Sequence, residues 1–228
     1  MFKTGTSRWL AIAVIATTCL LTAGSAWAQT QPSDVFWVNY FSNNVPGNKS
    51  GTDQEVRIIN PGAYAPNYPP ASLCAMIYVF DNQQEMKECC GCYISTNGLA
   101  ELSVAKDLTS NTFNGTAPKD GDIKIVSAVS NITIGGAPAC DPSGGGLNSS
   151  GGYVLNIAPT ADLRSWSSHL PGYQHSDGRT TEDEFQDATL STGELDSLQE
   201  ECTGVLAVGS GFGQCGQHAS NSSFSCTL

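Results

Sequence analysis

The chain has 228 residues and carries 21 acidic against 10 basic side chains, which gives a formal net charge of −11. A chain this acidic is repelled by phosphate backbones and by anionic lipid surfaces, so we expect no nucleic-acid partner. Its length suits one domain with a sizeable core, or one domain with a small appendage.

The first 28 residues have the three parts of a secretory signal peptide. Lys3 and Arg8 supply positive charge, residues 9–21 are apolar, and Ala26-Trp27-Ala28 matches a cleavage site. The apolar stretch is shorter than the roughly 20 residues that span a bilayer, and every later apolar run is shorter still, so we expect no membrane span after cleavage. We therefore predict a secreted or periplasmic protein that begins at Gln29. Its net charge becomes −13 because both basic residues leave with the signal.

Cleavage also removes Cys19 and leaves eight of the nine cysteines. An even number of cysteines in an oxidising compartment indicates a disulfide framework. The disulfide candidates are Cys74, Cys89, Cys90, Cys92, Cys140, Cys202, Cys215 and Cys226. Sequence alone leaves their pairing open, since eight cysteines allow on the order of a hundred connectivities.

Short apolar runs separated by turn-forming residues extend from Val35 to Ser130, which is the pattern of antiparallel β structure. The expected strands are residues 35–41, 55–60, 74–80, 86–92, 99–104 and 122–130, followed by 153–158 after the Gly-rich segment 142–152. The run at 74–80 is apolar on both faces, as in a central strand buried on both sides. We interpret residues 29–158 as one β-sandwich domain.

A hairpin loop at residues 82–84 would set the register of the two strands beside it. That register gives three facing pairs: Phe80 with Met86, Met76 with Cys90, and Cys74 with Cys92. Because side chains alternate along a strand, Cys90 and Cys92 should share one face while Cys89 points to the other. The register favours a Cys74–Cys92 disulfide, although a two-residue loop would shift every pair by one position.

After residue 158 the spacing of the apolar residues changes to that of helices. Thr160 is placed to cap a short helix with Leu163, Trp166 and Leu170 on one side. The acidic run at 182–184 fits the first turn of a further helix, where the helix dipole favours carboxylates.

Ser191 and Glu194 form a capping box ahead of a helical stripe. The stripe consists of Leu195, Leu198, Cys202 and Val205, and we interpret it as core packing. Residues 159–228 are therefore expected to form a helical C-terminal extension that packs on the sandwich and is pinned by disulfides. One expected pair is Cys202–Cys215, across the Gly-rich return.

Several segments resemble known bacterial sequences. Residues 57–61 (RIINP), a Phe-Asp turn and Asn97-Gly98 before residues 99–104 resemble the strand order of bacterial immunoglobulin-like sandwiches. SLCAMIYVFDNQQEMKECCGC, TNGLAELSVAKDLTSN and TEDEFQDATLSTGELDSLQEEC resemble a family of secreted, cysteine-containing bacterial proteins of unknown function, from about Glu55 to Cys215. The resemblance implies a disulfide-stabilised, immunoglobulin-like antiparallel β-sandwich and export. It implies no activity and no catalytic residues.

The cluster Cys89-Cys90-Gly91-Cys92 is the sharpest candidate for chemistry. Its thiolates could bind a soft metal, with Cys140, Cys202 or a histidine completing the site, or they could form a reactive disulfide. The spacing differs from the C-x2-C of zinc ribbons and thioredoxin-like motifs, and exported chains normally oxidise their thiols. We therefore predict structural disulfides here, with neither metal nor cofactor.

Two other groups of residues have a functional and a structural interpretation. His169, His175, Asp177 and the acidic run 182–184 could form a calcium or zinc site, but clustered acids usually form a solvated face, and we favour that interpretation. Four aromatic side chains could stack on sugars, although we expect them in the core: Trp37, Trp166, Tyr153 and Tyr173.

No catalytic motif stands out. The chain lacks the G-x-S-x-G elbow, and Gly209–Gly213 lacks the lysine of a P-loop. We therefore predict a secreted or envelope-associated, non-enzymatic surface or interaction module that binds a protein or a glycan. The alternatives are a metal-binding or redox protein that uses the cysteine cluster, and an extracellular polysaccharide hydrolase that uses paired carboxylates.

Overall fold

The structure is a computed structural model of the chain. It describes residues 35–42, 54–62, 72–134, 136–144, 146–147, 153–154, 156–169, 181–208 and 213–215. The predicted signal peptide and Cys226 lie outside these residues. The described residues belong to one compact unit, and no helix among them is long and apolar enough to cross a membrane.

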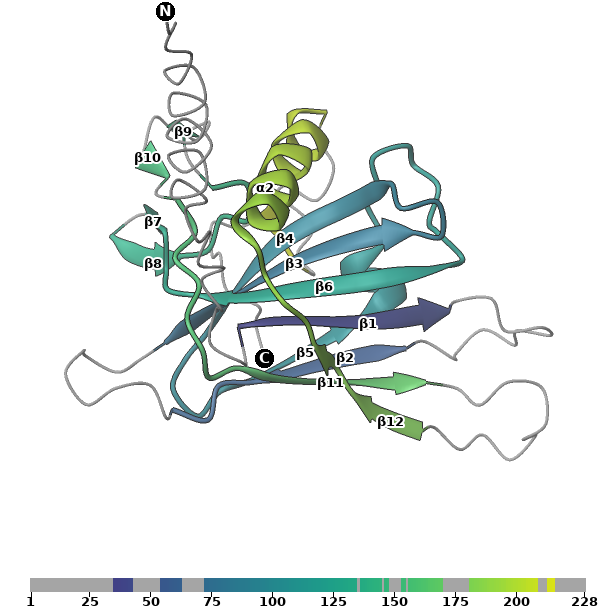
Figure 1. Cartoon of the computed structure of the whole chain (residues 1–228), viewed down its shortest axis with the longest axis horizontal. Helices are drawn as coiled ribbons and strands as arrows, with labels where there is room; N and C mark the ends of the chain where they lie inside the picture. The colour runs from purple at the N-terminus through teal and green to yellow at the C-terminus, as the bar shows by residue number, and fades with distance from the viewer. Residues whose placement is uncertain are drawn as a thin grey trace, which may run out of the picture. The chain divides into compact units, whose positions relative to one another are not determined.

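Two β-sheets make up most of the described chain (Figure 1). Sheet A has the strand order β13-β1-β6-β3-β4-β14, and sheet B has the order β12-β11-β2-β5. Every pair in them is antiparallel except β14 with β4. The bounds in sheet A are β1 (Phe36–Ser42), β3 (Leu73–Asp81), β4 (Met86–Ile94), β6 (Asp120–Ala128), β13 (Gln186–Asp187) and β14 (Gly213–Gln214). Those in sheet B are β2 (Glu55–Ile59), β5 (Leu99–Ser103), β11 (Arg164–His169) and β12 (Thr181–Glu184).

The remaining elements are short, apart from one helix. They are the π-helical turn η1 (Val104–Leu108), the pair β7 (Ile132–Ile134) and β8 (Ala137–Ala139), the pair β9 (Gly146–Leu147) and β10 (Tyr153–Val154), and the helix α2 (Thr192–Ala207). The prediction of a mainly β, antiparallel fold with a C-terminal helix is confirmed. The expected strand at 153–158 is wrong in extent, because only Tyr153–Val154 form a strand there.

Sheet A is buried on both faces and forms the middle layer. One apolar cluster fills the space between the sheets and includes Trp37, Ile58, Ile77, Leu102 and Ile125. A second cluster lies on the opposite face of sheet A and includes Leu198, Cys202 and Val205 of α2 together with Met76 and Tyr78 of β3. Figure 1 shows α2 lying over this face of the sheet. Strand β3 is therefore buried on both sides, as its continuous apolar run predicts.

The hairpin between β3 and β4 contains a β-bulge. Phe80 faces Met86 as predicted, but the next pair is Val79 with Glu88, so Lys87 is the extra residue. Its carbonyl oxygen accepts a hydrogen bond from Phe113 N instead. Beyond the bulge the predicted register is wrong by one residue: Met76 faces Gly91, and Ala75 faces Cys92.

The helix expected at Thr160 is wrong, because residues 164–169 form strand β11. Its buried positions alternate and are polar: Ser165, Ser167 and His169 point inward. Leu163 and Trp166 have helical spacing by coincidence, and Leu170 lies outside the described residues. The acidic run 182–184 belongs to β12, an exposed edge strand, and not to the first turn of a helix.

The helix α2 begins where its capping residue predicts. The Ser191 hydroxyl oxygen accepts a hydrogen bond from Glu194 N at 3.0 Å. The Glu194 carboxylate does not complete the capping box by bonding Ser191. It accepts a 2.8 Å hydrogen bond from Lys124 Nζ of β6, which joins the first turn of α2 to sheet A. Leu198, Cys202 and Val205 are buried, so the predicted packing stripe is confirmed.

Candidate functional site

The cysteines of β4 fasten the C-terminal part of the chain to sheet A. Cys89 is bonded to Cys202 of α2, and Cys90 is bonded to Cys215, next to β14. Cys92 is disulfide-bonded as well, and Cys226 lies outside the described residues. The sulfurs of this cluster are therefore oxidised, as predicted for a structural role.

Both predicted disulfides are wrong, because in each pair the two cysteines lie on opposite faces of sheet A. The bulge at Lys87 places Cys74 and Cys92 on opposite faces of sheet A, so they cannot meet. Cys74 is bonded instead to Cys140. Cys202 and Cys215 are likewise separated by sheet A, because Cys202 lies on the helix side and Cys215 lies between the sheets. The predicted opposite orientation of Cys89 and Cys90 is confirmed.

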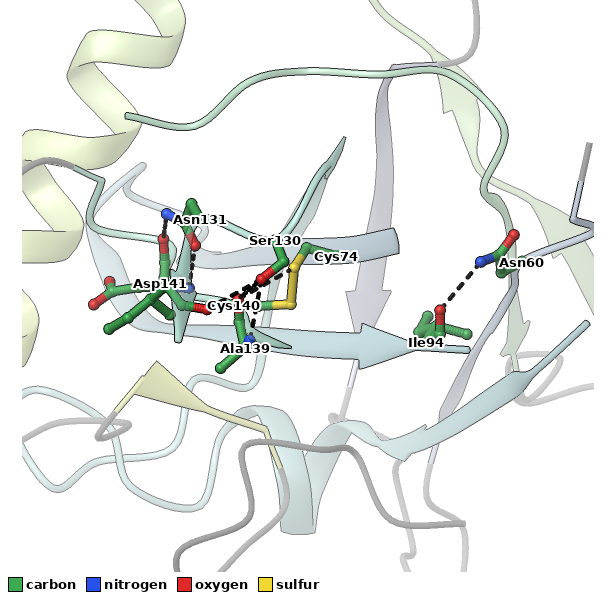
Figure 2. The surroundings of a disulfide bond; sticks show 9 residues. Asn60, Cys74, Ile94, Ser130, Asn131, Ala139, Cys140 and Asp141 are labelled. Atoms are coloured by element: carbon green, nitrogen blue, oxygen red, sulfur yellow. Dashed lines mark hydrogen bonds between the residues drawn. A yellow bond between two sulfur atoms is a disulfide. The ribbon is translucent and has the colours of Figure 1, made fainter. Parts of the chain in front are cut away.

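The backbone around Cys140 is held by side chains of the preceding turn (Figure 2). Asn131 Nδ2 donates to Asp141 O at 2.7 Å, and Asp141 N donates to Asn131 Oδ1 at 2.8 Å. The Ser130 hydroxyl donates to Ala139 O at 2.8 Å and accepts from Ala139 N at 3.1 Å. With the Cys74–Cys140 disulfide, these bonds fix this segment directly over Gly91 of β4.

A chain of buried polar side chains connects the edges of the two sheets. Asn39 of β1, Gln54 before β2, and Ser167 and His169 of β11 are all less than a tenth exposed. Asn39 Nδ2 donates to Ser167 Oγ at 2.8 Å, and Ser167 Oγ lies 2.7 Å from His169 Nε2. Gln54 Nε2 lies 3.1 Å from His169 Nδ1, and the ring of Tyr40 stacks on the imidazole at 4.5 Å. We call Asn39, Gln54, Ser167 and His169 the polar bridge.

The polar bridge superficially resembles a Ser-His-Asp triad, because Asp183 Oδ2 lies 3.9 Å from His169 Nε2. Its hydrogen bonds exclude that role. Gln54 Oε1 accepts from the backbone N–H of Ser42, which orients the amide so that Nε2 donates to His169 Nδ1. The ring proton is therefore on Nε2 and points toward Ser167. A general base for Ser167 needs the opposite tautomer, with a lone pair on Nε2.

Asn39 has its orientation fixed in the same way. Its Oδ1 accepts from the backbone N–H of Tyr40, so Nδ2 is the group that donates to Ser167. The Ser167 oxygen thus receives two N–H donors, one from Asn39 and one from His169. Burial lowers the pKa of His169, and the negative charge of Asp183 opposes that shift. His169 is neutral at pH 7 and serves as a structural hydrogen-bonding residue.

The structure describes only some of the residues of the candidate cation site around His169, for which we favour a solvated face. Asp183 lies beside His169, whereas His175 and Asp177 lie outside the described residues. Among the residues that the structure describes, no group of three or more His, Cys, Asp or Glu side chains is placed to hold a metal ion. The polar partners Asn39, Gln54 and Ser167 were missed because the segment at 164–169 was interpreted as helical; its period-two pattern of Ser165, Ser167 and His169 was the available signal.

Glu88 of β4 is a second buried titratable group. It is 2% exposed, and its Oε2 accepts a 3.3 Å bond from Asn111 N. Burial raises the pKa of Glu88 to about 7, and the nearby Asp107 carboxylate adds to this shift. The fold therefore favours the protonated acid.

This burial predicts a stability that falls as the pH rises. Because the folded-state pKa lies above the ordinary value, the penalty is absent below about pH 4.5 and grows until about pH 7. We expect Glu88→Gln to raise the free energy of unfolding by about 2 kcal/mol at pH 8 and to change nothing at pH 4. Urea unfolding at pH 4 and pH 8 measures the change, and Glu200→Gln, at an exposed position of α2, is the control. A variant no more stable than the parent at pH 8 would contradict the prediction.

The outer face of sheet B is an open surface with charged residues around one tryptophan. Arg57 of β2 bonds three carboxylates from three strands: Glu55 at 2.9 Å, Glu101 at 2.7 Å and Glu182 at 2.9 Å. Trp166 faces Arg57 on one side and Glu184 on the other, and it is partly exposed. We call Trp166, Arg57, Glu55, Glu101, Glu182 and Glu184 the sheet B face.

The structure describes the side chains of two of the four candidate sugar-stacking aromatics. Trp37 is 3% exposed and belongs to the core, so for it the core interpretation is confirmed. Trp166 is half-buried on the sheet B face. The side chain of Tyr153 and all of Tyr173 lie outside what the structure describes.

Comparison with protein families, with curated proteins and with solved structures finds no match for this chain.

Proposed function

We propose that this protein is a secreted or envelope-associated, non-enzymatic interaction module, and that its sheet B face binds a cationic protein surface. The disulfides support an oxidising compartment. The observation that carries the proposal is the position of Trp166, partly exposed beside Glu184 on an open sheet. An indole flanked by a carboxylate suits a lysine or arginine side chain, which gains a cation–π contact and an ion pair together.

The charges of this face favour a cationic partner over a glycan. Four carboxylates (Glu55, Glu101, Glu182 and Glu184) lie on it against the guanidinium groups of Arg57 and Arg164. Each donor nitrogen of Arg57 already bonds one of these carboxylates, so few donors remain for sugar hydroxyls. The remaining lone pairs of the carboxylates accept hydrogen bonds from ammonium or guanidinium groups.

A non-catalytic role is also supported by the polar bridge. Its serine and histidine form the hydrogen bonds of the tautomer that is unsuited to activating the serine. The cysteine cluster, which the metal-binding alternative requires as thiolates, carries disulfides. The metal-binding alternative therefore gains no support from this cluster.

The test is binding of a lysine-rich decapeptide to the protein at physiological salt, measured by isothermal titration calorimetry for every variant and also by tryptophan fluorescence for those that keep Trp166. Trp166 is the reporter, because the only other tryptophan after the predicted signal is the buried Trp37. We expect Trp166→Ala and Glu184→Lys each to weaken binding by about tenfold, the size of one cation–π contact or ion pair. Two matched controls, Phe113→Ala (52% exposed) and Glu200→Lys on α2, should leave binding unchanged.

Three results would overturn the proposal or part of it. Equal weakening by Glu184→Lys and Glu200→Lys would mean that only the overall charge attracts the peptide. Binding of soluble β-glucan or chitin oligosaccharides that depends on Trp166, in place of peptide binding, would make the ligand a glycan. Absence of both would remove the sheet B face as a binding surface.

A further inference from the structure

We propose that His169 is an acid-operated latch between sheet A and sheet B: when its ring gains a second proton, the polar bridge breaks and the end of β1 separates from β11. This inference is independent of the proposed binding function. It concerns the edge of the sandwich, where the C-terminal half of β1 lies beside β11 and β2. Its basis is the hydrogen-bond arrangement around the imidazole.

The closed bridge needs a lone pair on Nδ1. Gln54 Nε2 donates to that nitrogen, and the amide cannot simply turn over, because its Oε1 is occupied by the backbone N–H of Ser42. A proton on Nδ1 would place two donors 3.1 Å apart. To separate these two donors, either the Gln54–His169 bond or the Gln54–Ser42 bond must be lost. In both cases the link between β1 and β11 through Gln54 is broken.

The groups that face the imidazole give the protonated ring little compensation. From β1 come the Tyr40 ring and the Asn39 amide, from β11 the Ser167 hydroxyl, and from the start of β2 the Gln54 amide. Among the described neighbours the only charged group is Asp183 of β12, at 3.9 Å from Nε2 and 59% exposed. Asp183 faces Nε2, not the Nδ1 atom that would take the second proton, and its exposure to solvent weakens the ion pair.

The end of β1 depends on this bridge. On its outer side β1 pairs with β13 at Trp37 and Val38 only. Beyond Val38, Phe41 packs in the core between the sheets, and three further contacts join this edge to sheet B: the Asn39–Ser167 bond, the Ser42–Gln54 bond and the Tyr40–His169 stack. All three of these contacts include His169 or a residue bonded to it. Protonation thus acts on all three at once.

The direction of the pH effect follows from the lowered pKa of His169. The latch contributes fully above about pH 6.5, the ordinary histidine value, and its contribution is lost as the pH falls through the lowered folded-state value. Each pH unit in that window changes the ratio of closed to open forms by up to about tenfold.

Nuclear magnetic resonance of the protein from an exporting host tests the latch directly. We expect His169 to carry its proton on Nε2 at pH 8 and to titrate below about pH 6.5. As it titrates, the Tyr40 ring signals should shift, and amide exchange of Tyr40 and Ser42, whose N–H groups bond Asn39 and Gln54 of the bridge, should rise by about tenfold per pH unit after correction for intrinsic rates. Residues 123–126 in the centre of sheet A should stay protected and serve as the internal reference.

The decisive variant is Gln54→Glu. A carboxylate still accepts from Ser42 N, but it also accepts from a protonated Nδ1, so the pKa of His169 should rise above its ordinary value and the edge should stay closed at pH 5. Gln83→Glu adds the same charge to the exposed hairpin turn and should leave the opening unchanged. The proposal fails if His169 carries its proton on Nδ1 at pH 8, or if the amides of Tyr40 and Ser42 exchange no faster when His169 titrates. It also fails if both variants behave alike.

Discussion

Replacing Gly91 by alanine is expected to lower the free energy of unfolding by about 3 kcal/mol or more, the upper range for inserting a methyl group into a packed core. A Cβ atom at this position would lie 2.7 Å from Cys140 Cβ and 2.8 Å from Cys140 C, and closer still to its carbonyl oxygen. The backbone of Cys140 cannot retreat, because the Cys74 disulfide and the Asn131 bonds to Asp141 hold it. Glycine is thus the residue that allows this crossing.

Gly204 provides the matched control for this substitution. It lies within α2, and a Cβ atom added there would have no described neighbour within 4 Å, so Gly204→Ala should stabilise the protein by about 0.5–1 kcal/mol through helix propensity. Urea unfolding of both variants, followed by circular dichroism, measures the difference. If Gly91→Ala unfolds at the same urea concentration as the parent protein, the close approach of Cys140 to β4 is wrong.

Removing the Cys89–Cys202 disulfide is the second change with a large expected effect. The bond closes a loop with a sequence separation of 113, for which loop entropy predicts a loss of about 4–5 kcal/mol. The double variant Cys89→Ala with Cys202→Ala should therefore unfold at lower urea, and amides of α2 should exchange faster than those of β3. We expect both effects because the double variant no longer links α2 covalently to sheet A.

Removing Cys74 and Cys140 together gives the comparison. That bond has a sequence separation of 66, so the entropic loss should be smaller, and α2 should keep its protection relative to β3. Equal effects of the two double variants on α2 would contradict the assignment of the Cys89–Cys202 bond as the tether of the helix. An unchanged urea midpoint in both would contradict a stabilising role for either bond.

Local sequence patterns predicted correctly the elements whose structure depends only on residues close together in the chain. The apolar run of β3 has no polar face, so its burial on both sides follows from its composition. Ser191 carries its own capping oxygen, so the start of α2 is readable from a few residues. The opposite faces of Cys89 and Cys90 follow from alternation alone.

The predictions were wrong where the structure of an element depends on a residue far away in the sequence. The bulge at Lys87 accompanies a hydrogen bond from Phe113 N to the Lys87 carbonyl, and this one-residue insertion shifted the register from which the Cys74–Cys92 disulfide was inferred. Strand β11 buries Ser167 and His169 because Asn39 and Gln54 lie opposite them. Hydrophobic periodicity assumes that buried positions are apolar, and β11 breaks that assumption.

The position of the cysteines along the chain has a consequence for how the protein is made. Cys89 and Cys90 are synthesised long before their partners, which follow 113 and 125 residues later. During that interval the cysteines available nearby in the growing chain, Cys74, Cys92 and then Cys140, are for these two the wrong ones. Oxidation in order of appearance would therefore trap non-native bonds. Native pairing of Cys89 and Cys90 has to wait for Cys202 and Cys215, and a chain oxidised before that point needs thiol–disulfide reshuffling to mature.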